Sequence, residues 1–152
     1  MLPKYCRLAT FAFAAILISD SGIAAEAGSS PAGLWKTFDD RTREPRGTVR
    51  ISEENGIFFG RIESTFKPDE LNERCGKCPG DRRNAPIQGL IIIRGMRKNG
   101  FEYDGGEILD PETGNVYRCK FSLSPDGRRL SLRGYVGLSV FGRTQTWLRL
   151  AD

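Results

Sequence analysis

The chain has 152 residues, of which 28% are charged and 39% hydrophobic, and its formal net charge is +4. This balance is typical of one globular domain and argues against a disordered chain, and because the positive surplus is so small we expect no nucleic-acid partner. Histidine is absent, which removes the commonest general base and the commonest metal ligand. Eighteen glycines and eight prolines favour many short strands joined by turns.

The N-terminal segment has the three parts of a secretory signal peptide. A lysine and an arginine lie among the first seven residues, an apolar run follows at 8–18, and Ala25-Glu26-Ala27 offers a small-residue cleavage pattern. The apolar run is too short to cross a bilayer as a helix. We therefore expect a signal helix over 1–27.

Cleavage after Ala27 would leave a mature domain of residues 28–152, although cleavage after Ala25 stays open. Cys6 lies before the apolar run, whereas a bacterial lipoprotein needs its cysteine at the cleavage site. We therefore expect a soluble periplasmic protein that is not anchored to the membrane.

Eight segments of the mature domain alternate between apolar and polar residues, as strands with one buried face do. Turn residues separate them, most clearly at Asn55-Gly56 and Asn99-Gly100. An open meander would leave exposed edges, so we predict an all-β antiparallel up-and-down barrel of about eight strands, although glycines inside the strands would fit a sandwich equally. In chain order the expected strands are 33–38, 48–52, 57–66, 87–94, 101–109, 116–123, 130–136 and 143–150.

Three cysteines remain in the mature domain: Cys75 and Cys78 in a long loop at 67–86, and Cys119 in a strand. An oxidising compartment favours at least one disulfide. Our first interpretation pairs one loop cysteine with Cys119, which would pin the loop over the barrel mouth.

Two other uses of these cysteines stay open. Cys75 and Cys78 could form a redox-active C-x-x-C pair, although their flanks are typical of a loop rather than a helix start. A metal site of three thiolates would lack a convincing fourth ligand. We therefore expect neither a metal nor another cofactor.

No motif for enzymatic hydrolysis or phosphate binding is present. Asp39 and Asp40 are adjacent, would point to opposite faces of a strand, and lie near several arginines. The sequence favours a salt-bridged turn there rather than an acid–base pair. We expect no catalytic residue and no enzymatic activity.

The two ends of the predicted sheet carry a recognisable pairing. Gly33-Leu34-Trp35 opens the first strand and Trp147-Leu148-Arg149 lies in the last. This resembles the lipocalin and calycin pattern, in which an arginine packs across the first-strand tryptophan and closes the barrel floor. The resemblance implies that Gly33, Trp35 and Arg149 close the barrel.

The mature chain also resembles the bacterial family known as domain of unknown function 2147. That resemblance implies a small exported protein with a lipocalin-like barrel, and it supplies no catalytic residues. The residues that carry it are Gly33-Leu34-Trp35, Asp39-Asp40, Cys75-x-x-Cys78, Pro86-Ile87-Gln88-Gly89, Gly105-Gly106-x-Ile108-Leu109-Asp110-Pro111, Gly114, Tyr117-x-Cys119, Leu130, Arg133-Gly134-Tyr135-x-Gly137 and the run from Phe141 to Trp147.

The leading hypothesis is a non-catalytic module that binds a small apolar or amphipathic molecule, or a lipid fragment, with the 67–86 loop as a lid. One alternative is an envelope protein whose packed barrel presents loops to a protein or cell-wall partner, and another is a thiol-active protein using Cys75 and Cys78. The side chains expected to line the interior are Phe58, Ile62, Phe66, Phe101, Tyr103, Tyr117 and Phe121.

Overall fold

The structure is a computed structural model that describes residues 30–70 and 72–151. The predicted signal peptide over 1–27 and both of its cleavage positions lie outside the described residues.

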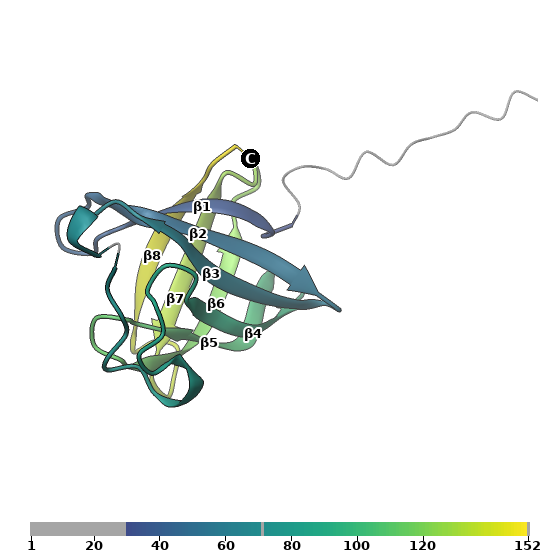
Figure 1. The fold of residues 1–152 in the computed structure, drawn as a ribbon. Coiled ribbons are helices and arrows are strands. Elements are labelled where there is room, and N and C mark those ends of the chain that lie inside the picture. The colour runs from purple at the N-terminus through teal and green to yellow at the C-terminus, as the bar shows by residue number, and fades with distance from the viewer. Residues whose placement is uncertain (1–29, 71, 152) are drawn as a thin grey trace, which may run out of the picture.

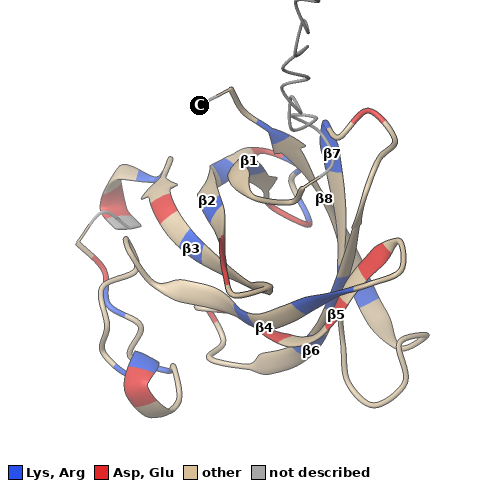
Figure 2. Cartoon of the chain, turned by 90° about the vertical axis from the view of Figure 1, so that its right-hand side faces the viewer, with Lys and Arg blue, Asp and Glu red and all other residues tan. Residues whose placement is uncertain are grey.

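Eight antiparallel strands form one closed barrel in the order β1 to β8 (Figure 1). Figure 2 shows the strands as a ring along which the positions of basic and acidic residues are distributed. The predicted eight-stranded up-and-down barrel is therefore confirmed. The strands are β1 (Gly33–Phe38), β2 (Pro45–Glu54), β3 (Ile57–Thr65), β4 (Ile91–Asn99), β5 (Glu102–Leu109), β6 (Val116–Leu123), β7 (Arg129–Tyr135) and β8 (Gly142–Arg149).

The predicted fourth strand is displaced, because residues 87–90 belong to the preceding loop. Ile87 N–H donates to the Glu73 carbonyl at 2.9 Å, and Leu90 N–H donates to the Ile87 carbonyl at 3.1 Å. These bonds fold the segment back on itself, so β4 begins only at Ile91. The loop also holds two short 3₁₀ helices, η1 (Pro68–Glu70) and η2 (Gly80–Arg82).

One turn and one strand irregularity show why glycine is required at particular positions. Asn55 and Gly56 have φ of 54° and 77°, the left-handed pair that a tight β2–β3 hairpin requires. At Gly106 a side chain would collide with the Arg94 carbonyl on β4, and the register of β5 against β6 shifts just before it. The strands can approach closely at this irregularity only because Gly106 lacks a side chain.

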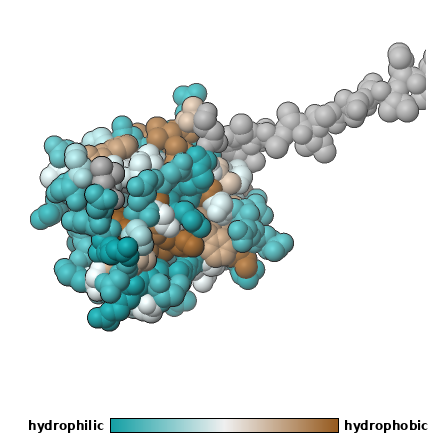
Figure 3. Space-filling view, in the orientation of Figure 1, coloured by the Kyte–Doolittle hydropathy of each residue, from teal (hydrophilic) through white to brown (hydrophobic). Residues whose placement is uncertain are grey.

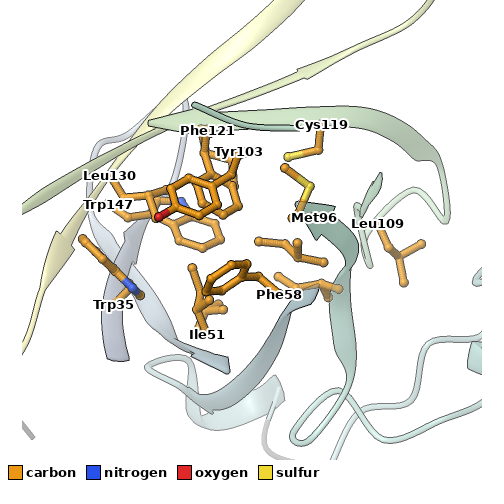
Figure 4. Close-up of a cluster of buried hydrophobic side chains, with 14 of the residues drawn as sticks. Trp35, Ile51, Phe58, Met96, Tyr103, Leu109, Cys119, Phe121, Leu130 and Trp147 are labelled. Carbon is orange, nitrogen blue, oxygen red and sulfur yellow. The ribbon is translucent and has the colours of Figure 1, made fainter. Parts of the chain in front are cut away.

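One end of the barrel is filled by large side chains (Figure 4). The ring of Phe58 meets that of Tyr103 edge-on with centroids 5.0 Å apart, and Tyr103 stacks on Phe121 at the same separation. Trp35 and Trp147 are 0% and 2% exposed in the same cluster. This end is therefore a packed core, closed where β1 begins and β8 ends.

Candidate ligand-binding cavity

The opposite end of the barrel is hollow. A cavity of about 1030 Å³ opens between the last residues of β1, β3, β5 and β7 and the first residues of β2, β4, β6 and β8. This is at the upper end of the size range of small-molecule sites, roughly 300–1,000 Å³. Its apolar lining includes Val49, Ile62, Ile92, Ile108, Leu109, Leu132 and Trp147.

Polar groups in the cavity wall are largely paired with one another. The hydroxyls of Thr48 and Ser64 lie 2.8 Å apart across β2 and β3. The indole N–H of Trp147 donates to the Gln145 side-chain oxygen at 3.0 Å. The wall therefore combines apolar side chains with hydroxyl and amide groups that can orient a ligand.

Charged side chains surround the mouth. Arg46, at the start of β2, lies 3.7 Å from the Asp39 carboxylate and 2.5 Å from Glu112 in the β5–β6 turn. Arg143 on β8 lies 3.6 Å from Asp40. Since β2 and β5 are not neighbours in the barrel, the Arg46–Glu112 ion pair links two separate parts of the rim.

Asp39 stabilises the turn that follows β1. Its carboxylate accepts hydrogen bonds from the backbone N–H groups of Thr42 and Arg41, both at 2.9 Å. These two bonds, that from Thr42 first, lower the pKa of Asp39. The carboxyl is thus held in its ionised form, in agreement with the predicted salt-bridged turn.

The disulfide joins Cys75 to Cys78, and the predicted pairing with Cys119 is wrong. The loop sulfurs lie at the β5–β6 turn, where Cys75 Sγ is 3.4 Å from the Pro111 carbonyl. Cys119 lies in the middle of β6, is 0% exposed and remains a free thiol. Because Cys75 and Cys78 are joined in the disulfide, they cannot act as thiolate ligands, so the alternative of a three-thiolate metal site is also contradicted.

Residues 73–78, here called the disulfide segment of the loop, border the mouth. Lys77 Nζ donates to the Glu112 carbonyl at 3.0 Å, and Gly114 packs so closely on the Lys77 carbonyl that any side chain there would collide. Glu73, Arg74, Gly76 and Lys77 contribute to the cavity lining. Part of the long loop therefore lies beside the opening, where a lid would have to lie.

A second contact fastens the loop to the outside of the barrel. Arg82 of η2 bonds Glu107 on β5 at 2.8 Å, and Asp81 pairs with Arg94 on β4 at 2.8 Å. The Arg94 guanidinium also lowers the pKa of Asp81. These ion pairs hold the loop on the β4–β5 face, away from the opening, so only its disulfide segment borders the cavity.

The seven predicted lining residues separate into three groups. Ile62 and Tyr117 line the cavity. Phe58, Tyr103 and Phe121 point inward but belong to the packed end (Figure 4). Phe66 and Phe101 are 47% and 99% exposed, so the prediction that they point inward is wrong.

The two errors have the same cause. Phe101 precedes the first residue of β5 and lies in the turn after Gly100, whose φ is 61°. Phe66 follows the last residue of β3. Alternation predicts a facing direction only while the strand continues, and both residues lie beyond a strand end.

Sequence reasoning missed several residues of the cavity. Val49 alternates with polar neighbours in β2, so period-two counting could have found it. Ile92 lies in an unbroken apolar run and Ile108 follows the register shift before Gly106, so counting alone does not give their direction. Arg46 and Glu112 offered no such signal, because the ion pair depends on how a strand start and a distant turn meet. Among the described residues, no group of three or more Cys, Asp or Glu side chains could hold a metal ion, and no helix could span a bilayer.

Comparison with known proteins agrees with this architecture. A family model described as "Uncharacterized protein conserved in bacteria (DUF2147)" matches residues 33–149. Protein HP1028 from the human pathogen Helicobacter pylori, described as belonging to the lipocalin family, has a similar structure, with a TM-score of 0.71, 21% sequence identity, and coverage of 81% of this chain and 84% of that chain. At this identity the likeness shows the fold alone. No curated protein matches the sequence.

Proposed function

The chain belongs to the DUF2147 family of bacterial proteins, and we propose that it is an exported, non-catalytic module that binds a small apolar or amphipathic molecule, such as a lipid fragment, in the periplasm. The observation that carries the proposal is the unequal filling of the barrel. Large side chains fill one end, whereas a cavity of about 1030 Å³ occupies the other.

The distribution of polarity in the cavity favours an amphipathic ligand. Deep in the wall, side chains such as Ile62 and Leu132 offer apolar contact for a hydrocarbon group. At the rim, Asp39, Arg46 and Glu112 can hydrogen-bond a polar end. A ligand would therefore lie with its apolar part inside and its polar part at the mouth.

Export is part of the proposal and is supported by two observations. The N-terminal segment has the charged start, apolar run and small-residue site of a signal peptide. The Cys75–Cys78 disulfide is the form that these cysteines take in an oxidising compartment.

Both alternatives find less support. A packed barrel that only presents loops is hard to reconcile with the open cavity. A thiol-active role would require accessible sulfur, whereas Cys75 and Cys78 are each 1% exposed.

Fluorescence titration with the apolar probe N-phenyl-1-naphthylamine tests the proposal. The probe should brighten and bind saturably at one site, and native mass spectrometry should detect a one-to-one complex. Ile62→Trp would place a larger side chain in the cavity and should weaken binding, whereas Phe101→Trp, on the outer surface at the packed end, should not. No binding by the wild-type protein, or equal binding by a folded Ile62→Trp variant, would remove the proposal.

A further inference from the structure

We propose that the β7–β8 loop, residues 136–141, inserts into a phospholipid surface containing anionic lipid and so places the cavity mouth against the membrane. This inference goes beyond the proposed function and does not depend on which ligand the cavity takes. We call residues 136–141 the apolar loop.

The apolar loop exposes an unusual concentration of hydrophobic side chains. Val136, Leu138, Val140 and Phe141 are 67%, 70%, 69% and 72% exposed, and they account for half of the large exposed hydrophobic residues in the described part of the chain. Single exposed apolar residues are common on protein surfaces, but a cluster on one loop marks a contact with a partner or a membrane.

The barrel holds this loop in place instead of letting it collapse onto the wall. Arg133 on β7 donates to the carbonyls of Ser139, at 2.5 Å, and Val140, at 2.9 Å, and to the Thr144 hydroxyl at 2.7 Å. Phe141 N–H closes a turn onto the Leu138 carbonyl at 3.0 Å. The apolar side chains are thus displayed on an ordered loop, which lowers the entropy cost of inserting them.

Basic groups beside the loop suit the headgroups of anionic lipids. Arg143, with its side chain 81% exposed, lies two residues after the loop, and its contact with Asp40 brings the β1–β2 loop alongside. Arg41 and Arg43 are exposed on that neighbouring loop. Asp39 and Asp40 pair with Arg46 and Arg143 and so offset the charges of those two arginines. Glu44 is exposed and offsets one more positive charge, so Arg41 and Arg43 leave a small positive surplus beside the loop. Cations next to an inserted apolar tip add attraction to an anionic leaflet.

The shape of the surface favours a membrane over a second protein. Four side chains on a six-residue loop make a narrow tip, whereas a stable protein interface buries roughly 1,200–2,000 Å² in total. Figure 3 shows one face of the molecule, on which hydrophilic side chains predominate and apolar surface shows between them. A narrow tip can enter the boundary between headgroups and acyl chains without a matching partner surface.

The apolar loop is continuous with the cavity. Val136 and Phe141 are exposed on the loop and also contribute to the cavity lining. Insertion of the loop would therefore bring the mouth to the lipid surface and give an amphipathic molecule an apolar path from bilayer to barrel.

Flotation with vesicles of phosphatidylethanolamine and phosphatidylglycerol, in a three-to-one ratio, tests this inference. The purified protein should float with the vesicles, and Leu138→Asp with Val140→Asp should reduce the bound fraction at least about tenfold, since each change replaces an inserted aliphatic side chain with a charged one. Phe101→Asp is the matched control, because Phe101 is 99% exposed at the opposite end. Its binding should equal that of the wild type.

The outcomes separate this inference from the proposed function. Leu138 and Val140 do not line the cavity, so the double variant should still take up N-phenyl-1-naphthylamine from solution. Wild-type protein that does not float, or a double variant that floats equally well, would overturn the inference while leaving cavity binding intact. A wild-type dimer in light scattering that the double variant abolishes, without flotation, would assign the loop to a second copy of this chain instead.

Discussion

The guanidinium of Arg149 lies 4.3 Å from the ring centre of Trp35, and the two residues are register partners across β1 and β8. The same guanidinium donates to the carbonyls of Ser30 at 2.6 Å, Ala32 at 2.8 Å and Gly127 at 2.7 Å. One planar side chain therefore stacks on the floor of the barrel and satisfies three backbone acceptors around it. This is the contact that the lipocalin resemblance led us to expect.

Replacing Arg149 by lysine should destabilise the fold although the charge is kept. An ammonium group cannot stack its plane on Trp35 or reach three carbonyls in a fixed fork. We expect a loss of about 2–4 kcal/mol in the free energy of unfolding, from three charge-assisted hydrogen bonds and one cation–π contact. Urea denaturation followed by tryptophan fluorescence measures this loss. The control Arg97→Lys changes an exposed arginine and should unfold at the same urea concentration as the wild type. Equal midpoints for all three proteins would contradict the role of Arg149 in closing the barrel.

Reducing the Cys75–Cys78 disulfide should loosen the mouth and leave the barrel intact. The bond closes a very short loop, so its removal costs only roughly 2 kcal/mol by chain entropy. The lost order should be local, because the segment contacts the β5–β6 turn through Lys77. Hydrogen exchange in Cys75→Ser with Cys78→Ser should quicken at residues 73–87 and 110–115. Cys119→Ala serves as the control, and its loop amides should exchange as in the wild type.

Burial raises the pKa of the Cys119 thiol from 9.0 to about 12, so this residue should make stability depend on pH in the alkaline range. Above pH 9 the unfolded chain releases the thiol proton while the folded chain retains it. Stability is therefore lost as pH rises from about 9 towards 12, by up to about 1.4 kcal/mol per pH unit.

Comparison of the wild type with Cys119→Ala isolates this effect. Burial also raises the pKa of Tyr103, but that contribution is common to both proteins and cancels in the difference. The wild type should lose about 2 kcal/mol more than the variant between pH 7 and pH 10.5. Parallel pH profiles would mean that the thiol ionises in the folded barrel. Iodoacetamide should also leave Cys119 unmodified in the native protein at pH 8.

Turns and the facing direction of strand residues depend on neighbouring residues and could be predicted from the sequence. Contacts between loops that are distant in the sequence could not. Asn55-Gly56 predicts a hairpin, and the alternation along β6 predicts that Cys119 and Phe121 face the barrel interior. The predicted disulfide partner was wrong because the inward direction of Cys119 does not indicate whether the loop that carries Cys75 and Cys78 reaches it. Phe101 was mistaken because the alternation of β5 was extended into a turn. Whether a cavity forms depends on how completely side chains from all eight strands fill each end of the barrel, and this cannot be read from any one segment.

Breaking the ion pair between Arg46 and Glu112 should speed ligand exchange with little loss of stability. The pair joins β2 to the β5–β6 turn across the mouth, and it is partly exposed, so its contribution to stability is at most about 1 kcal/mol. In Glu112→Gln the rim should open more often, and stopped-flow uptake and release of N-phenyl-1-naphthylamine should both quicken severalfold. Salt should quicken exchange in the wild type, because it screens the pair, but much less in the variant.

The matched control for this prediction lies on the barrel wall. Arg50 and Glu63 form an ion pair of 2.6 Å between the neighbouring strands β2 and β3, and neither residue lines the cavity. Glu63→Gln removes the same charge from a pair of similar exposure, so probe exchange should keep its wild-type rate. If both variants quicken exchange equally, the effect comes from net charge and not from a link across the mouth. If neither does, the probe passes through a part of the rim that this ion pair does not control.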